Sequence, residues 1–174
     1  MTGSTAHSMR APGWACSRSA AMPASTLQPS LETVDVERLL AGIAADLEQA
    51  HPGARIEWAV EPVTSDRVML RHILQNLVAN ACKFGGRPPH VRITTERDGG
   101  DTVLCVADNG AGFDAAEAGR LFELFHRAPG AGAPGHGVGL AVVKHLVDRL
   151  GGRVWAETGP GGSRFRVALP GPSG

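Results

Sequence analysis

The stretch LRHILQNLVANACKF, residues 70–84, contains the pattern that decides the fold of this chain. Its apolar residues recur at spacings of three and four, forming one stripe along a helix: Leu70, Ile73, Leu74, Leu77, Val78 and Ala81. Asn76, Asn80 and Lys83 share a different face of this helix, which we expect to begin near Asp66. An amide oxygen is a hard ligand that suits Mg²⁺, and a lysine suits phosphate as a point charge. This face favours a metal-bound polyphosphate over a plain solvated surface.

The length and composition of the chain exclude several classes of protein. Its 174 residues suffice for one domain with a substantial core and a tail. Acidic and basic residues balance at 17 each, which argues against nucleic acid or an anionic membrane as a partner. No apolar run approaches the roughly 18 residues of a membrane span, and no signal peptide is recognisable. Cys16, Cys82 and Cys105 match neither a disulfide framework nor a zinc site, so we expect free thiols in a cytoplasmic protein.

The rest of the chain alternates between strand and helix patterns. Residues 1–30, rich in Ser, Ala, Pro and Gly, lack a sustained apolar period and are expected to be loose. Residues 102–107 are continuously apolar, as in a strand covered on both faces, whereas the Gly, Ala and Pro content of residues 128–137 favours a mobile loop. The predicted elements are helix 33–50, strand 55–60, a link at 61–65, the central helix, strand 90–96, a turn at 97–101, strand 102–107, helix 115–126, helix 138–150 and strands 153–157 and 164–169. Together they predict a two-layer α/β sandwich, a mixed and mostly antiparallel sheet with helices on one face.

Asp108 ends the predicted buried strand and is followed by Asn-Gly-Ala-Gly-Phe. A carboxylate at this place can accept hydrogen bonds from an exocyclic amine such as that of adenine. Gly110 and Gly112 would allow positive φ and the close approach of a ligand. Taken alone, however, the stretch is better explained as an ordinary Asp-Asn-Gly turn.

Two further stretches could complete a site. GHGVGL, residues 135–140, opens a helix after the glycine-rich loop, and backbone N–H groups at a helix start bind phosphate. It follows a loop rather than a strand, unlike a dinucleotide-binding fingerprint, so by itself it is equally a glycine hinge. LFELFHR, residues 121–127, reads as the end of an amphipathic helix, in which at least one phenylalanine packs in the core and His126 lies at the surface.

The order and combination of these stretches resemble the ATP-binding catalytic domains of sensor histidine kinases, in the superfamily that includes gyrase-type ATPases and heat-shock chaperones. NLVANACKF (76–84) resembles the N box, DNGAGF (108–113) the G1 box, LFELFHR (121–127) the F box and GHGVGL (135–140) the G2 box. The tail GGRVWAETGPGGSRFRVALP is similar to the way these domains finish. The resemblance covers residues 31–170, with 1–30 as an N-terminal segment and 171–174 as a tail, and implies the Bergerat-type ATP-binding fold.

The resemblance also implies a role for the matching residues, with ATP and Mg²⁺ as cofactors. Asn80 would ligate Mg²⁺, Asn76 and Lys83 would lie near the phosphates, and Asp108 would hold adenine. The G2 box would close its backbone over the phosphates. The further nucleotide-binding residues that the boxes imply are Gly110, Gly112, Phe125, Arg127, Gly135, His136, Gly137, Val138, Gly139 and Leu140.

Asn76 discriminates within this superfamily. The ATPases and the anti-sigma serine kinases usually place a glutamate four residues before the metal-binding asparagine, where it acts as general base on water or a serine hydroxyl. The chain has Asn76 at that position, and an amide cannot take up a proton. A neutral imidazole is already a nucleophile and needs no such base, so Asn76 favours phosphoryl transfer to histidine over hydrolysis.

Residues 6–12, AHSMRAP, look like an altered copy of the family's phosphoacceptor box, which usually reads His, an acid, an apolar residue, Arg, any residue and Pro. Ser8 replaces the acid, and Gly13 stands where an apolar residue is common. At about 1.5 Å per residue, the stretch from His7 to Leu31 is too short for the family's two-helix dimerisation hairpin, and its prolines oppose helix formation. Either most of the hairpin is deleted or the likeness is a coincidence, and His7 is a candidate phosphoacceptor on the first reading.

The resulting hypothesis is an ATP·Mg²⁺-dependent protein histidine kinase domain of two-component signalling. Its partners would be a histidine-bearing dimerisation hairpin or a response regulator protein. One alternative is a non-catalytic ATP-binding module from a truncated kinase, which the short N-terminal segment favours. The other is a serine kinase of the anti-sigma type, against which Asn76 and the well-formed F box argue.

Overall fold

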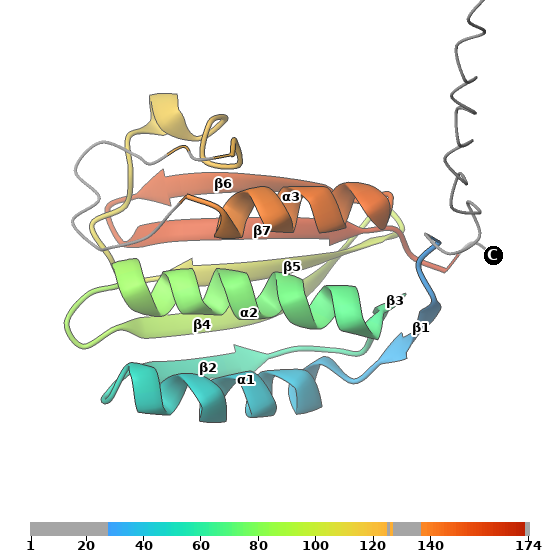
Figure 1. Ribbon diagram of the computed structural model, residues 1–174, viewed down its shortest axis with the longest axis horizontal. Helices are drawn as coiled ribbons and strands as arrows, with labels where there is room; N and C mark the ends of the chain where they lie inside the picture. Colours follow the sequence, from blue (N-terminus) through green and yellow to red (C-terminus); the bar gives the residue numbers. More distant parts are fainter. Residues whose placement is uncertain (1–27, 125, 127–136, 173–174) are drawn as a thin grey trace, which may run out of the picture.

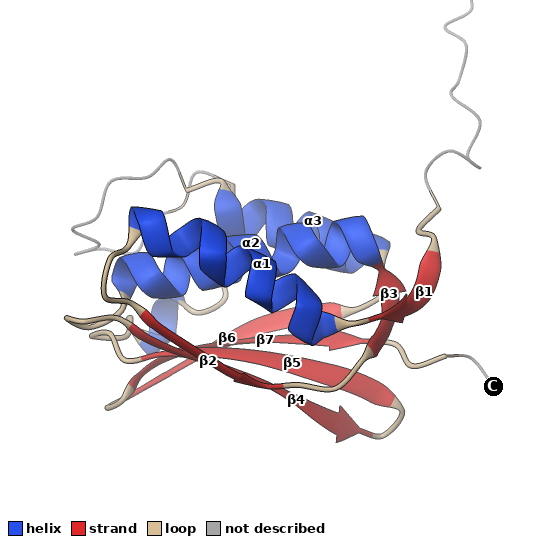
Figure 2. Ribbon diagram, turned by 90° about the horizontal axis from the view of Figure 1, so that it is seen from below, coloured by secondary structure: helices blue, strands red, loops and turns tan. Residues whose placement is uncertain are grey.

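The computed structural model describes residues 28–124, 126 and 137–172. Five strands form a sheet in the order β2-β4-β5-β7-β6, and three helices cover one of its faces (Figure 1, Figure 2). β2 and β4 are parallel, and the other neighbouring strands are antiparallel. The predicted fold class is therefore confirmed. The elements are β1 Leu31–Val34, α1 Val36–Ala50, β2 Arg55–Ala59, β3 Val63–Asp66, α2 Arg67–Phe84, β4 His90–Asp98, β5 Asp101–Asp108, the 3-10 turn η2 Ala115–Glu117, α3 Gly139–Arg149, β6 Arg153–Gly159 and β7 Gly162–Leu169.

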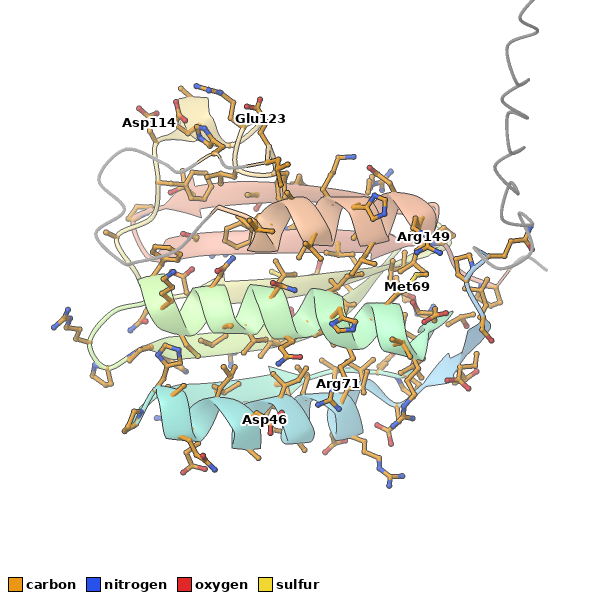
Figure 3. The ribbon with its side chains drawn as sticks, in the orientation of Figure 1. Asp46, Met69, Arg71, Asp114, Glu123 and Arg149 are labelled. Carbon is orange, nitrogen blue, oxygen red and sulfur yellow. The ribbon has the colours of Figure 1, made fainter. Side chains whose placement is uncertain are left out.

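Helix α2 is the central element of the helical layer and lies between α1 and α3 (Figure 1). The helix begins next to Asp66, as predicted, and Asp66 is its N-cap, because its Oδ1 accepts hydrogen bonds from the N–H groups of Val68 and Met69, each 3.0 Å long. Near its solvent side, Arg71 forms an ion pair of 3.5 Å with Asp46 of α1 (Figure 3). The predicted apolar stripe is fully buried against the sheet, and truncating one such leucine to alanine costs about 2–5 kcal/mol. Its residues are Leu70, Ile73, Leu74, Leu77, Val78 and Ala81.

Strands β1 and β3 form a separate two-stranded antiparallel sheet, which the sequence did not predict. Thr33 was expected in a helix and residues 61–65 in a link, yet Thr33 pairs with Thr64 and Val34 with Val63. The helix begins only at Val36, because Asp35 is its N-cap and accepts a hydrogen bond from Arg38 N–H. Four-residue strands whose partners lie about thirty residues apart leave no local period to detect.

The predicted helix at 115–126 is replaced by a single 3-10 turn, η2, followed by turns up to residue 124. Asp114 caps η2 by accepting a hydrogen bond from Ala116 N–H, and Figure 3 shows Asp114 and Glu123 on this short segment. Leu121 is nevertheless buried, and the ring of Phe122 meets that of Phe165 edge-on at 6.3 Å. The apolar pattern therefore indicated the buried side chains correctly but not the backbone, since the glycine at position 119 disfavours helix.

Strand β5 is buried on both faces, as its continuous apolar run predicted, although helices cover only one. On the helix-free face, Arg166 of β7 spans Glu96 and Glu157 at 3.4 and 3.3 Å and lies opposite Cys105. Long side chains thus take the place of a second helical layer by covering the strand with their stems. Cys105 and Cys82 are free, as predicted, and burial raises the pKa of both thiols.

Candidate functional site

Asp108 occupies the last position of β5 and is the one buried carboxylate among the described residues. Its Oδ1 accepts hydrogen bonds from Gly110 N–H at 2.8 Å and from Ser163 N–H at 3.3 Å. Burial raises the pKa of the Asp108 carboxyl, and these hydrogen bonds oppose the rise. A carboxylate has about four acceptor positions, so Asp108 keeps the capacity to accept from a ligand after binding two backbone donors.

Three glycines allow the chain to pack tightly around Asp108. A Cβ on Gly110 would collide with the Phe84 carbonyl at the end of α2, and a Cβ on Gly162 would collide with the Asp108 carbonyl. Gly112 has φ +76° and leaves only 2.5 Å between a built Cβ and Thr158 Oγ1. The expected positive φ is thus confirmed for Gly112 but wrong for Gly110, whose missing side chain makes room for α2 instead.

Ser163 and Thr158 are polar neighbours of Asp108 that the sequence did not single out. Ser163 is only 7% exposed, and its hydroxyl lowers the pKa of the Asp108 carboxyl. Thr158 lies directly opposite Ser163 across the β6–β7 pair and accepts a hydrogen bond from Phe113 N–H at 3.1 Å. Only the register of the hairpin brings these residues to Asp108, so no local signal in the sequence could have found them.

The three polar residues of α2 share one partly buried face, as predicted. Asn76 Nδ2 donates a hydrogen bond of 2.8 Å to the carbonyl of His72, one helical turn earlier. This bond fixes the amide so that its Oδ1 points away from the backbone, toward α3. Lys83, near the end of the helix, places its ammonium 5.2 Å from the centre of the Phe84 ring.

The first turn of α3 meets this face of α2. A Cβ built on Gly139 would lie 3.0 Å from Asn76 Oδ1 and 3.9 Å from Asn80 Nδ2, so glycine permits the close approach. Val138 is the N-cap and provides no side-chain hydrogen bond to the helix, which leaves the N–H groups of the first turn available to a ligand. Gly137 has φ +66°. Within the described part of the predicted G2 stretch, Gly137 to Leu140, it is Gly139 that lies beside Asn76 and Asn80.

Several predicted site residues fall outside the described part of the chain: His7, Phe125, Arg127, Gly135 and His136, together with most of the loop at 128–137. His126 is described and differs from the prediction. Its Nε2 lies 2.7 Å from Glu117 Oε2, and its side chain is only 11% exposed, so it does not lie at the surface of a helix.

A hollow at the end of the sheet shares Asp108, Thr158 and Ser163 with this site. Its other lining residues are those of the β6–β7 turn together with Ala107, Glu157 and Arg164, which alternate with core residues and therefore face away from the helices. The polar side chains of α2 lie on the other side of the sheet, so the hollow is not the meeting place of α2 and α3.

The family model for histidine kinase-, DNA gyrase B- and HSP90-like ATPases matches residues 65–173, which include α2, β5 and α3. This chain belongs to that family. The match confirms the resemblance inferred from the four boxes, and the relatives and structural neighbours identify the chain as an ATP-binding domain of the histidine-kinase type.

Three proteins similar to this chain illustrate the family. The phytochrome-like protein Cph1 of Synechocystis sp. is 35% identical over 139 residues, which make up 78% of this chain but 18% of Cph1. The structure of the mycobacterial sensor histidine kinase MprB superposes with a TM-score of 0.72 at 27% identity and covers 82% of this chain and 98% of that one. Full-length ShkA, crystallised with AMPPNP, gives a TM-score of 0.71 at 33% identity, covering 82% of this chain and 31% of ShkA. The chain thus spans about a fifth of the length of Cph1.

The donor atoms at this site suit a Mg²⁺ ion that is shared with water and phosphate, rather than a metal ion that protein side chains enclose on their own. Within residues 28–124, 126 and 137–172, no group of three or more His, Cys, Asp or Glu side chains could enclose an ion. Mg²⁺ commonly takes only one or two protein oxygens and completes its shell with water and phosphate. The half-buried amides of α2 fit that arrangement.

Within residues 28–124, 126 and 137–172, no helix is long and apolar enough to cross a membrane.

Proposed function

We propose that this domain is the catalytic domain of a two-component histidine kinase, which binds ATP·Mg²⁺ and transfers the γ-phosphoryl group to a histidine. The observation that carries the proposal is the contact of α2 with two separate elements. Its polar face meets the first turn of α3 at Gly139, and its carboxyl end meets the Asp108 turn at Gly110. The 18 residues of α2 thus connect the Asp108 carboxylate, which can accept a hydrogen bond from an adenine amine, to the first turn of α3, whose N–H groups can bind phosphate.

At one end, Asp108 recognises adenine. Its carboxylate accepts from the exocyclic amine, while the Gly110 and Ser163 N–H groups hold the carboxylate in place. The Ser163 hydroxyl donates its one proton to the same carboxyl group and so helps to keep it ionised as an acceptor. A guanine base, which carries a carbonyl where adenine has the amine, would meet an acceptor rather than a donor and be rejected.

At the other end, the first turn of α3 and the polar face of α2 hold the phosphates. Asn80 contributes an amide oxygen to Mg²⁺, and Lys83 balances phosphate charge. The backbone N–H groups that follow Val138 add donors to the phosphate oxygens. Mg²⁺ would neutralise the negative charge that develops on the β- and γ-phosphates during transfer.

The acceptor is a histidine because the site offers no general base where a hydroxyl nucleophile would need one. Asn76 occupies the sequence position where the ATPases of this superfamily usually have the catalytic glutamate, and its Nδ2 donates a hydrogen bond to the His72 carbonyl. A neutral imidazole attacks the γ-phosphorus with its own lone pair. The nitrogen–phosphorus bond forms as the bond to the bridging oxygen breaks, and ADP leaves with those electrons. Positioning and charge stabilisation supply the catalysis.

The histidine comes from a dimerisation hairpin, from which a response regulator then receives the phosphoryl group. His7 remains a candidate acceptor that lies outside the described residues. Its missing acidic neighbour deprives the imidazole of a group that would orient it and raise its basicity. We therefore expect feeble autophosphorylation of this chain and efficient transfer only to an intact hairpin added in trans.

The test is incubation with γ-labelled ATP, alone and with such a hairpin, followed by an acid wash. Acid-labile label on the hairpin supports transfer to histidine. Acid-stable label would support the serine-kinase alternative, and ATP binding without any label would support a non-catalytic module. Strong acid-labile label on the chain alone that is lost in His7→Gln would show that the N-terminal segment carries the acceptor.

A further inference from the structure

Asn109 bridges two parts of the site that are distant in sequence. Its Oδ1 accepts hydrogen bonds from the N–H groups of Gly86 and His90, both 2.8 Å long, and its Nδ2 donates to the Pro88 carbonyl at 3.2 Å. Gly86 and Pro88 belong to the connection between α2 and β4, and His90 is the first residue of β4. One amide on the adenine-binding turn therefore satisfies three backbone groups at the junction of α2 with β4.

The packing at this junction leaves no room for side chains. A Cβ on Gly86 would lie 2.8 Å from Asn109 Nδ2, and one on Gly85 would lie 2.6 Å from the Ala81 carbonyl. Gly85 has φ −64° and ψ 174°, so α2 does not end in the left-handed glycine conformation common at helix ends. The end of the helix is instead held by Asn109 from across the site, and Gly110 rests on the Phe84 carbonyl beside it.

We propose that Asn109 is a positioning residue that sets the distance between the adenine-binding turn and the metal-binding end of α2. The inference rests on the proposed function, because only a ligand that engages both ends senses that distance. Asp108 has its own bonds to Gly110 and Ser163, so losing the bridge leaves the adenine acceptor in place. The end of α2 then shifts relative to it, and Asn80 and Lys83 no longer meet the Mg²⁺–triphosphate of a base held by Asp108.

The test compares ATP binding in Mg²⁺ with binding in EDTA, by calorimetry, for wild type, Asn109→Ala and Gly86→Ala. Asn109→Ala removes the side chain that forms the bridge, and the methyl group of Gly86→Ala would press against Asn109 Nδ2. Each should weaken ATP·Mg²⁺ by about tenfold, since small misplacements of this kind are costly, while affinity in EDTA changes less than about twofold. The double variant should lose little more than either single one, because both act on the same bridge.

Thr95→Val is the matched control. Thr95 Oγ1 also accepts a side-chain-to-backbone bond, from Glu61 N–H at 2.8 Å, but it ties the β2–β3 link to β4. Its removal should change neither affinity. Equal weakening in Mg²⁺ and EDTA, wild-type affinity in both Asn109→Ala and Gly86→Ala, or full additivity in the double variant would overturn the inference. Failure of the wild type to bind ATP in either condition would instead refute the proposed function.

Discussion

The adenine end and the phosphate end of this site are built from different secondary-structure elements. The adenine end consists of strand termini, where β5, β6 and β7 bring Asp108, Thr158 and Ser163 together and their hydrogen bonds are already made. The phosphate end consists of two helices that meet through Asn76 and Gly139. There the amides are half-buried, the first turn of α3 has no side-chain cap, and Phe84 is 42% exposed.

The difference shows how rigidity is distributed over one site. Paired strands fix their register through backbone hydrogen bonds on both sides, so a carboxylate on them can be held in place before any ligand arrives. Donors at a helix start remain unsatisfied until an anion meets them. We therefore expect variants at the adenine end to alter base selectivity, and variants at the phosphate end to alter dependence on Mg²⁺.

The largest effect is expected for Asn80→Ala at the phosphate end. Loss of a metal ligand should lower ATP affinity in Mg²⁺ by about a hundredfold and leave almost no difference between Mg²⁺ and EDTA. Calorimetry on Asn80→Ala and on Gln75→Ala, an exposed neighbour on the same helix, checks this. Equal affinities of Asn80→Ala and wild type in Mg²⁺ would contradict the metal assignment.

Asp108→Asn should weaken adenine nucleotides by about tenfold, the value of a hydrogen bond to a charged group, and leave the domain folded. The asparagine oxygen can still accept from Gly110 and Ser163, but its NH₂ group opposes the adenine amine. Replacing a buried carboxylate by an amide also removes a desolvation penalty. Competition between ATP and GTP, followed alongside a thermal melt, measures both. An unfolded variant, or equal loss of ATP and GTP, would make Asp108 a structural residue.

The raised pKa of Asp108 predicts opposite pH dependences for binding and stability. Adenine needs the ionised acceptor, so ATP affinity should fall as the pH drops through this pKa, which lies above the ordinary value of 3.8. A carboxyl whose pKa is raised on folding contributes stability at pH values below its unfolded pKa and loses it as the pH rises through the folded one. Melting and ATP titrations between pH 4 and pH 7 (about the range in which such groups titrate) should show both trends, and Asp108→Asn should flatten them. Parallel trends in wild type would contradict this assignment.

Gly139→Ala should have a smaller effect at the phosphate end. The new methyl group would press on Asn76 Oδ1, 3.0 Å away, and move the first turn of α3, which we expect to lower ATP·Mg²⁺ affinity about fivefold. Stability should not fall, since alanine favours helix over glycine by roughly 0.5–1 kcal/mol. Gly42→Ala in α1, where nothing lies within 4 Å of the new Cβ, should stabilise the domain without changing affinity. Identical affinities for the two variants would show that the approach of α3 to α2 is unimportant.

Asp66→Ala should leave ATP affinity unchanged and affect stability alone. The variant loses the N-cap of α2, worth about 1 kcal/mol, and the bond of 2.9 Å from Ser30 N–H. Hydrogen bonds led by that from Met69 N–H lower the pKa of Asp66, so its contribution is present above pH 3.8 and is lost as the pH falls through the folded pKa. Chemical denaturation at pH 7 and about pH 3 measures the difference, which should shrink at the lower pH. A change in ATP affinity would link the cap to the site.

The sequence predicted the elements whose evidence is local. The apolar stripe and the cap of α2 lie within twenty residues, so both the position and the buried face of the helix could be inferred from spacing alone. The pairing of β1 with β3 could not, because Thr33 and Thr64 carry no alternation and meet only in the folded chain. In the segment after Asp114, the local pattern predicted a helix that does not form. Leu121 and Phe122 nevertheless pack against the core from a backbone of turns.

The residues of the site also fall into those that the sequence could predict and those that only the folded structure reveals. Asn76, Asn80 and Asp108 stand out in the sequence because their residue types and positions suggest chemistry, and the structure places the two amides beside the first turn of α3. Ser163, Thr158 and Asn109 resemble ordinary hairpin and turn residues. Their importance arises from the register of β7 with β5 and from the junction of α2 with β4, which are properties of the assembled fold.

The most direct measurement is an amide NMR titration of the domain with adenosine and then with ATP·Mg²⁺. Adenosine should shift the backbone amides from Asp108 to Gly112 and those of Gly162 and Ser163, and leave α3 unchanged. ATP·Mg²⁺ should in addition shift the amides of Gly139, Leu140 and Ala141 and the side-chain amides of Asn76 and Asn80. Shifts confined to the helix-free face around Arg164 and Glu157, or the absence of shifts with ATP·Mg²⁺, would contradict a site in which α2 joins an adenine end to a phosphate end.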